Sequence, residues 1–231
     1  MSKTVILLCG VAQSGKSTIA TMLNGIFKGE VNEVALANKL KKVCSERFDL
    51  PLETFSDQRY KEIPFSIFNF PVVLYHSIFR DILDDFNIKP TVDGKELTHK
   101  EIYELWERDY NYYEFTSARH IAQFVGTELL RKFGGPDIHC QNVELKDGIN
   151  VITDCRFSNE FDYFTNIEDM VVVPIYLDRK VAESRVNENS HQSEKEVFLF
   201  RHKCDQLDNN KSLLETRLDL ENILRYHTLI D

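Results

Sequence analysis

A short apolar run near the start of the chain is followed by a segment with helical periodicity. Residues 5–9 are all hydrophobic, which is typical of a strand buried on both faces of a parallel sheet. Residues 18–27 place their apolar side chains at helical spacing, at Ile19, Ala20, Met22, Leu23, Ile26 and Phe27. The pattern predicts a strand, a loop and a helix in this order, with another short strand at 34–36.

The alternation of strands and helices returns later in the chain. Helical patterns occupy 38–47, 117–133 and 179–203, and β-rich runs occupy 149–153, 170–177 and 206–207. Ser212 and Glu215 form the capping box of a last helix, whose apolar positions are Leu213, Leu214, Leu218, Leu220, Ile223 and Leu224. This order predicts an α/β three-layer sandwich with a mainly parallel sheet, which binds ligands beyond the carboxyl ends of its strands.

Residues 52–115 differ in character, because they are rich in Phe, Tyr and charge and contain Pro64, Pro71 and Pro90. Helices are expected near 72–86 and near 99–109, the second opened by a capping box of Thr98 and Glu101. We interpret this segment as an inserted, mostly helical subdomain within a single domain of 1–231. Its aromatic side chains form either the subdomain core or part of a ligand pocket.

Composition narrows the class of protein further. With 231 residues, 42% hydrophobic and 28% charged, the chain is able to form a packed core. Its net charge of −9 argues against binding to duplex nucleic acid, which needs a basic face. No apolar run approaches the ~18 residues of a membrane span, and the N-terminal run is too short for a signal peptide. The five scattered cysteines are expected to be reduced thiols, mostly buried, in a cytoplasmic protein without a zinc site.

Residues 10–17 read Gly-Val-Ala-Gln-Ser-Gly-Lys-Ser, a complete match to the phosphate-binding pattern G-x-x-x-x-G-K-[ST]. The strand before it and the helix after it are the context that this motif requires, so a P-loop NTPase form of the sandwich is expected. Backbone N–H groups would face phosphate oxygens, Lys16 would reach the β- and γ-phosphates, and the Ser17 hydroxyl would bind Mg²⁺. The residues expected to bind ATP are Gly10, Gln13, Ser14, Gly15, Lys16, Ser17 and Thr18.

Asp154 ends an apolar strand, where such proteins place a carboxylate for Mg²⁺ or its water shell. Arg156 follows two residues later and would project over the strand ends, although an ordinary ion pair at the strand exit explains both residues. A second polar group, the stripe of Arg119, Gln123, Thr127 and Arg131, shares one face of the helix at 117–133. A solvated surface explains this stripe as well as a ligand site does.

Gly126 lies in the middle of the same helix, where glycine costs about 1 kcal/mol relative to alanine. Close approach of a ligand, or tight packing against another helix, would explain its presence.

The order of these motifs resembles that of the bacteriophage-type deoxynucleoside monophosphate kinases. Besides the P-loop, the resemblance is carried by segments 36–41 (like A-D-P-L-K), 57–62 (like E-R-x-x-K-E), 117–128 (like R-x-x-L-Q-x-L-G-T-E), 154–160 (like D-V-R-F-P-N-E), 191–194 (like H-x-S-E) and 208–210 (like D-N-x-G-S-L). The chain departs from the pattern at Lys39 and Ser158, where proline is usual. It departs also at His139, where an aromatic residue that stacks on the base is usual.

The resemblance implies an ATP- and Mg²⁺-dependent enzyme of nucleotide biosynthesis that phosphorylates deoxynucleoside 5′-monophosphates in the cytoplasm, of the host if the protein is viral. Because the acceptor is already an oxyanion, Lys16, Arg119, Asp154 and Arg156 would act by positioning and charge neutralisation. Acceptor contacts are implied for Lys41, Arg59, Arg119, Gly126, Thr127, Arg131, His139, Asp154, Arg156 and Glu160. Partners would be small nucleotides, with no polymeric nucleic acid and no membrane, in a monomer or homodimer.

Residues 179–203 contain Arg179 and Arg185, which resemble arginines that a mobile lid closes over ATP. A charged surface helix explains the same segment. Two other functions would use the same P-loop: a kinase for another small acceptor, such as a sugar, and a nucleotide-dependent ATPase or switch. The last usually needs an arginine from a partner, whereas this chain carries arginines of its own.

Overall fold

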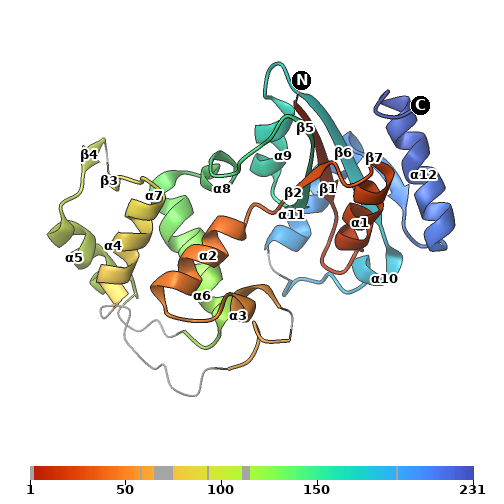
Figure 1. Ribbon diagram of the computed structural model, residues 1–231. Coiled ribbons are helices and arrows are strands. Elements are labelled where there is room, and N and C mark those ends of the chain that lie inside the picture. Colours follow the sequence, from red (N-terminus) through yellow and green to blue (C-terminus); the bar gives the residue numbers. More distant parts are fainter. Residues whose placement is uncertain (1–2, 58, 65–74, 93, 111–114, 191) are drawn as a thin grey trace. The chain divides into compact units, whose positions relative to one another are not determined.

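The computed structural model describes residues 3–57, 59–64, 75–92, 94–110, 115–190 and 192–231. The chain forms two compact units, which Figure 1 shows as ribbons. We name Met1–Leu36 with Val143–Asp231 the sheet unit, and Ala37–Asn142 the helical unit. The helical unit is wider than the predicted insertion at 52–115, because helices before and after that range contribute to the same core.

The sheet unit is built on five parallel strands in the order β2-β5-β1-β6-β7. Their bounds are β1 Lys3–Cys9, β2 Val31–Val34, β5 Gly148–Cys155, β6 Val171–Asp178 and β7 Asp205–Asp208. The central strand is apolar throughout, and Ile6 pairs in register with Val151 on one side and Val173 on the other. The predicted α/β fold with a parallel sheet is confirmed.

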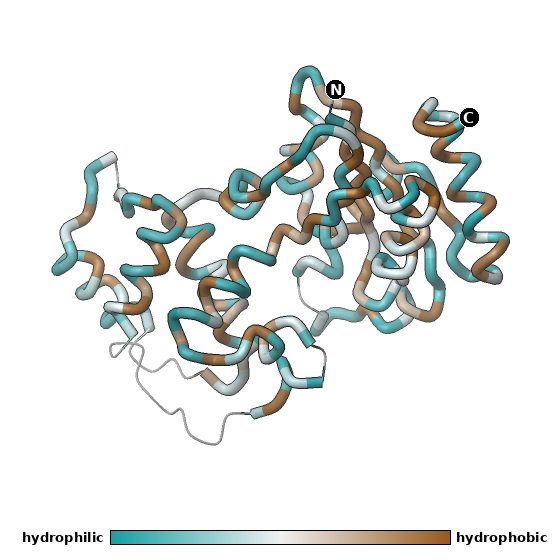
Figure 2. The backbone as a smooth tube through the Cα atoms, viewed as in Figure 1, coloured by the Kyte–Doolittle hydropathy of each residue, from teal (hydrophilic) through white to brown (hydrophobic). Residues whose placement is uncertain are grey.

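Helices flank this sheet on both faces (Figure 1). Their bounds are α1 Lys16–Ile26, α9 Ser158–Thr165, α10 Lys180–Glu183, α11 Gln192–Phe200, η3 Arg201–Lys203 and α12 Leu213–Tyr226. The steps from β1 to β2 and from β5 to β6 run in opposite directions across the sheet, so right-handed crossovers put α1 and α9 on opposite faces. Figure 2 shows hydrophobic residues concentrated in the strands between these helices.

The helical unit holds a core of aromatic side chains. Its elements are α2 Asn38–Arg47, α3 Leu52–Ser56, α4 His76–Asp85, β3 Thr91–Val92, β4 Lys95–Glu96, α5 His99–Tyr110, α6 Ala118–Phe124, the π-helix η2 Val125–Arg131, α7 Lys132–Gly134 and α8 Ile138–Gln141. Phe79, Trp106, Phe115 and Phe124 are all buried, and Phe79 meets Trp106 edge to face at 5.3 Å between ring centroids. Of these four, Phe79, Trp106 and Phe115 belong to 52–115 and therefore form core, as one of the two interpretations expected.

Several elements differ from their predicted bounds. The second strand ends at Val34 instead of spanning 34–36, because the Leu36 N–H leaves the sheet and donates to Asp154 Oδ1 at 2.7 Å. The predicted helix at 117–133 widens into a π-helix from Val125. The helical prediction for 179–203 is wrong at 184–190, which form turns between α10 and α11. Of the helix predicted near 72–86, residues 72–74 lie outside the described residues, as do Pro71, Gln58 and His191.

The last helix buries fewer apolar residues than predicted. Leu220 and Leu224 are fully buried, whereas Leu213, Leu214 and Leu218 are exposed, Leu214 at 69%. For Leu214 and Leu218 the reason is geometric: the face that meets the sheet carries Thr216, Leu220 and Leu224 at four-residue spacing, and these two leucines lie off it, whereas Leu213 is the first residue of the helix. The capping box of Ser212 and Glu215 is confirmed.

The five cysteines are free thiols, four of them buried, as predicted.

Within the described part of the chain, no helix is both long and apolar enough to cross a membrane.

Candidate functional site

Residues 10–17, which we name the glycine loop, connect β1 to α1 at the carboxyl edge of the sheet. Gly10 and Gly15 have φ angles of 143° and 101°, which side chains other than glycine rarely tolerate. A Cβ on Gly15 would lie 2.4 Å from Asn209 Nδ2, and this amide donates to Ser14 O at 2.6 Å. The loop is thus held in a tight curl by its own glycines and by Asn209.

Lys16 is buried inside this curl, with 8% of the residue exposed. Its Nζ donates to Gly10 O and Val11 O, both at 2.7 Å. Burial lowers the pKa of Lys16 to about 8, and the nearby Arg156 adds to this effect, while Glu194 and Asp154 act against it. A buried ammonium whose contacts are carbonyl oxygens, beside an arginine, is suited to an anionic ligand.

Oxygen donors suited to Mg²⁺ occur at the same edge of the sheet. Ser17 is exposed at the start of α1, and Asp154 is near the end of β5, where its Oδ1 accepts from Leu36 N. Hydroxyl and carboxylate oxygens are hard ligands of the kind that Mg²⁺ prefers. Among the described residues, no cluster of three or more His, Cys, Asp and Glu side chains suits a metal. A Mg²⁺ ion here would therefore take its remaining ligands from water and phosphate, as is usual for it.

Arg156 follows β5, which lies next to β1 in the sheet, and the Cys9–Cys155 register places it level with the glycine loop. Its Nη1 contacts Glu194 Oε1 at 2.7 Å. Its backbone N–H donates to the buried Glu160 carboxylate at 2.9 Å, and so does the N–H of Phe157 at 3.1 Å. Glu160, a predicted substrate contact, therefore caps the start of α9 and fixes the backbone that carries Arg156.

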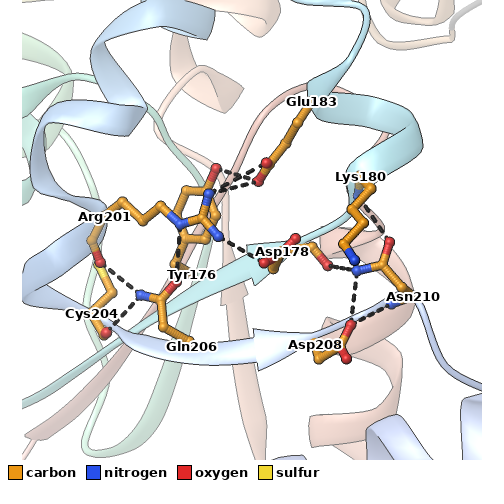
Figure 3. A network of polar contacts seen from close by, with 9 residues as sticks. All are labelled: Tyr176, Asp178, Lys180, Glu183, Arg201, Cys204, Gln206, Asp208 and Asn210. Atoms are coloured by element: carbon orange, nitrogen blue, oxygen red, sulfur yellow. Dashed lines mark hydrogen bonds and ion pairs between the residues drawn. The ribbon is translucent and has the colours of Figure 1, made fainter.

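A polar network fixes α10 to the ends of β6 and β7 (Figure 3). The Arg201 guanidinium lies 4.6 Å from the centre of the Tyr176 ring, and it pairs with Asp178 at 2.7 Å and with Glu183 at 3.3 Å. Asn210 donates to Asp178 O at 3.1 Å and accepts from the first backbone N–H of α10 at 2.9 Å. The strand ends and the short helix therefore form one hydrogen-bonded assembly.

This assembly carries the two arginines predicted as lid groups. Arg179 follows β6 directly, and its Nη1 is 3.5 Å from the position that a Cβ on Gly15 would take. Arg185 lies in the turns after α10 and donates to Gln13 Oε1. Both guanidinium groups therefore reach the glycine loop.

The helical unit carries the other predicted cations. Arg119 is the second residue of α6. Its backbone N–H donates to Lys61 O at 3.0 Å, and its Nε lies 2.7 Å from Glu62 Oε1. Arg59 is largely exposed and pairs with Asp57 at 2.6 Å, a contact that lowers the pKa of Asp57 to about 2. Lys41 lies partly exposed on α2. Lys61 and Glu62 thus lie beside the start of α6.

Gly126 lies in the π-helix η2, where its missing side chain permits close packing. A Cβ there would be 3.0 Å from Leu40 Cδ2 and 3.6 Å from His139 Nε2, and His139 Nε2 is 3.2 Å from Gly126 O. Tight packing, one of the two explanations offered for this glycine, is present. His139 is buried in that packing, while Thr127 is exposed and Arg131 half-buried.

Two residues of the site were not assigned a role by the sequence. Asn209 and Glu194 both contact the glycine loop, across 195 and 182 residues of chain. Each lies within a segment that carries the family resemblance (191–194 and 208–210), and this position is the signal from which the sequence could have assigned them to the site.

Comparisons of the chain with protein-family models and with curated proteins found no match.

Proposed function

We propose that this protein is a P-loop NTPase-fold kinase that transfers the γ-phosphoryl group of ATP to deoxynucleoside 5′-monophosphates, with Mg²⁺ as its metal. The observation that carries the proposal is Lys16, a buried ammonium enclosed by loop carbonyls at the carboxyl edge of a parallel sheet. In sheets of this kind, ligands generally bind at this edge, at the point where the strand order reverses. The Arg156 guanidinium, one strand away, supports a phosphate-directed site.

The donor side of the reaction would use the sheet unit. Lys16 and the loop N–H groups would hold the β- and γ-phosphates, and Ser17 and Asp154 would hold Mg²⁺ or its waters. When bound, Mg²⁺ neutralises charge on the phosphate oxygens. Arg179 and Arg185, which reach the glycine loop, would stabilise the triphosphate and exclude water in the manner of a lid.

The acceptor side would use cations of the helical unit. Arg119 is the first candidate, and Lys41 and Arg131 are further candidates. A guanidinium grips phosphate through two parallel hydrogen bonds, which fixes orientation as well as charge. The acceptor oxygen needs no general base, because a monophosphate is already ionised. In-line transfer would then depend on positioning and on electrostatic stabilisation of the spread negative charge.

The remaining predictions belong to the same proposal: membership of the bacteriophage-type deoxynucleoside monophosphate kinases, a role in nucleotide biosynthesis in the cytoplasm, and activity as a monomer or homodimer. Their support is the motif order of the sequence together with the parallel sheet and the loop geometry of the sheet unit.

An acceptor panel tests the proposal directly. Purified protein with ATP and Mg²⁺ would be assayed for ADP release with each deoxy- and ribonucleoside monophosphate, with a sugar set, and with no acceptor. We expect ADP only when a nucleoside monophosphate is present, with at least one deoxynucleoside monophosphate preferred. The Lys16→Met variant, prepared identically, controls for contaminating kinases.

Two results would replace the proposal. ADP release at the same rate with and without acceptor would indicate an ATPase. Activity with sugars alone would indicate a kinase of another class, because the donor site is common to both and the acceptor site decides.

A further inference from the structure

Glu194, in the first turn of α11, reaches back to the glycine loop. Its Oε2 accepts the backbone N–H of Ala12 at 2.5 Å, and its Oε1 lies 2.7 Å from Arg156 Nη1. The carboxylate is largely buried, with 15% of the side chain exposed. One carboxylate therefore joins the loop, the end of β5 and the start of α11 within the sheet unit.

The groups that Glu194 binds are those that a phosphate would need. Ala12 is the third residue of the loop, whose N–H groups recognise phosphate in this motif. Arg156 supplies a guanidinium, and Lys16 is close enough for Glu194 to raise its pKa. A carboxylate and a phosphate have the same sign of charge and the same kind of acceptor oxygens, so they compete for these donors.

The position of Ala12 indicates which phosphate is concerned. The backbone N–H groups of Lys16 and Ser17, at the start of α1, lie on the limb of the loop that would receive the inner phosphates at a helix N-terminus, whereas Lys16 Nζ reaches Gly10 O and Val11 O on the other limb. Ala12 lies on the other limb and is joined to Arg156 through Glu194. The seat between Ala12 and Arg156 therefore matches the outermost phosphate of a bound nucleotide.

We propose that Glu194 is a specificity-determining residue that occupies the seat of the terminal phosphate, so that a triphosphate must displace it and a diphosphate need not. This inference rests on the proposed function, because it takes the glycine loop to be a nucleotide site. Specificity through a built-in repulsive group is a general device in recognition. Here the Glu194 carboxylate would weaken binding of the triphosphate relative to that of the diphosphate, and it would leave the contacts with the inner phosphates unchanged.

The test compares binding of two nucleotides to matched variants. The dissociation constants of a non-hydrolysable ATP analogue and of ADP, each with Mg²⁺, are measured by calorimetry on the full chain and on Glu194→Gln. The amide is similar in size and lacks the charge. We expect Glu194→Gln to bind the ATP analogue at least about fivefold more tightly than the parent does, which is in the usual range of coupling between sites. The dissociation constant of ADP should change less than about twofold.

Glu196→Gln is the control, because Glu196 lies on the same helix and contacts Ser158 N at 3.3 Å and the Gln192 amide at 3.0 Å. It should leave both constants unchanged. Glu194→Ala serves as a second variant, with the same expected direction, and circular dichroism checks that each variant is folded.

The outcomes separate the two proposals. If the parent binds both nucleotides and Glu194→Gln changes neither, or changes both equally, the inference about Glu194 is overturned and the proposed function stands. If neither nucleotide binds to the parent or to any variant, the proposed function fails and the inference fails with it.

Discussion

The two units present their charged groups in different ways. In the sheet unit, Arg156 and Arg179 directly follow strands β5 and β6, Lys16 begins the helix that the glycine loop joins to the strand between them, and backbone geometry fixes their places. In the helical unit, Arg119 lies in the first turn of a helix and Arg59 in a turn, and they pair with the exposed Glu62 and the half-buried Asp57. The first arrangement is built into the chain path, and the second depends on side-chain pairs.

This difference predicts how each region responds to change. Lys16 contacts carbonyl oxygens of its own loop, so a phosphate can approach it without displacing a carboxylate partner from Nζ. Arg119 pairs with a half-exposed Glu62, and such surface pairs contribute only about 0–1 kcal/mol. A phosphate would therefore displace Glu62 readily, and Arg119 is available to bind an anion.

Replacing Arg119 by alanine tests the helical unit with the largest expected effect. If Arg119 holds the acceptor phosphate, Arg119→Ala should lower kcat/KM for the monophosphate about 100-fold, the scale seen when a charge-stabilising donor is removed. The dissociation constant of an ATP analogue should change less than about twofold. Steady-state kinetics with varied acceptor, together with calorimetry, measures the two quantities.

Arg108→Ala is a matched control, since Arg108 is an exposed arginine of the same unit that pairs with Asp109 at 2.7 Å. It should have parental acceptor kinetics. If Arg119→Ala also has the acceptor kinetics of the parent, Arg119 is a solvated surface residue that pairs with Glu62 and does not hold the acceptor.

The pH dependence of nucleotide binding tests the sheet unit, with a smaller expected effect. The pKa of Lys16 is lowered to about 8, chiefly by burial, and a bound polyphosphate would favour the charged form and raise it. At pH values between the pKa of the free protein and that of the complex, nucleotide binding takes up a proton. The affinity is therefore constant below about pH 8 and falls above it, by up to about tenfold per pH unit. Calorimetric titrations with an ATP analogue from pH 7 to 10 measure this slope.

Lys16→Arg provides the comparison, because a guanidinium stays charged throughout this range. The neighbouring Cys9 thiol does not interfere, since its hydrogen bonds to Cys155 and Cys204 and its burial raise its pKa well above the ordinary value. A flat affinity profile in the parent up to pH 10 would contradict the assignment of Lys16 as the group that meets the phosphate.

The same contrast explains what the sequence predicted. The strand, loop and helix around residues 10–17 were predicted because backbone chemistry fixes them locally: two glycines with positive φ and a helix start. Glu194 and Asn209 reach that loop from far along the chain, and no local pattern encodes such contacts. The π-helix at Val125–Arg131 was missed because helical spacing fits either kind of turn, and the close packing of Leu40 and His139 at Gly126 is a tertiary contact that no local pattern encodes.

Two helical glycines, Gly25 one residue before the end of α1 and Gly126 in η2, allow the smallest and most local comparison. Gly25 in α1 has open space where a Cβ would point, whereas a Cβ on Gly126 would meet Leu40 Cδ2 at 3.0 Å. Gly25→Ala should therefore gain up to about 0.5 kcal/mol in free energy of unfolding, because the propensity difference of a helix interior applies only in part at the next-to-last residue. Gly126→Ala should gain nothing and lose about 1 kcal/mol, because overpacking outweighs the propensity term.

Urea unfolding measures both effects. Far-UV circular dichroism follows the whole chain, and fluorescence of the single tryptophan, the buried Trp106, follows the helical unit. The larger Gly126→Val change should destabilise the helical unit further, since its branched side chain adds volume at the same contact. A stabilised Gly126→Ala would mean that Leu40 moves aside at little cost. The glycine would then be explained by access to the π-helix backbone, as a ligand contact requires, and the packing explanation would fail.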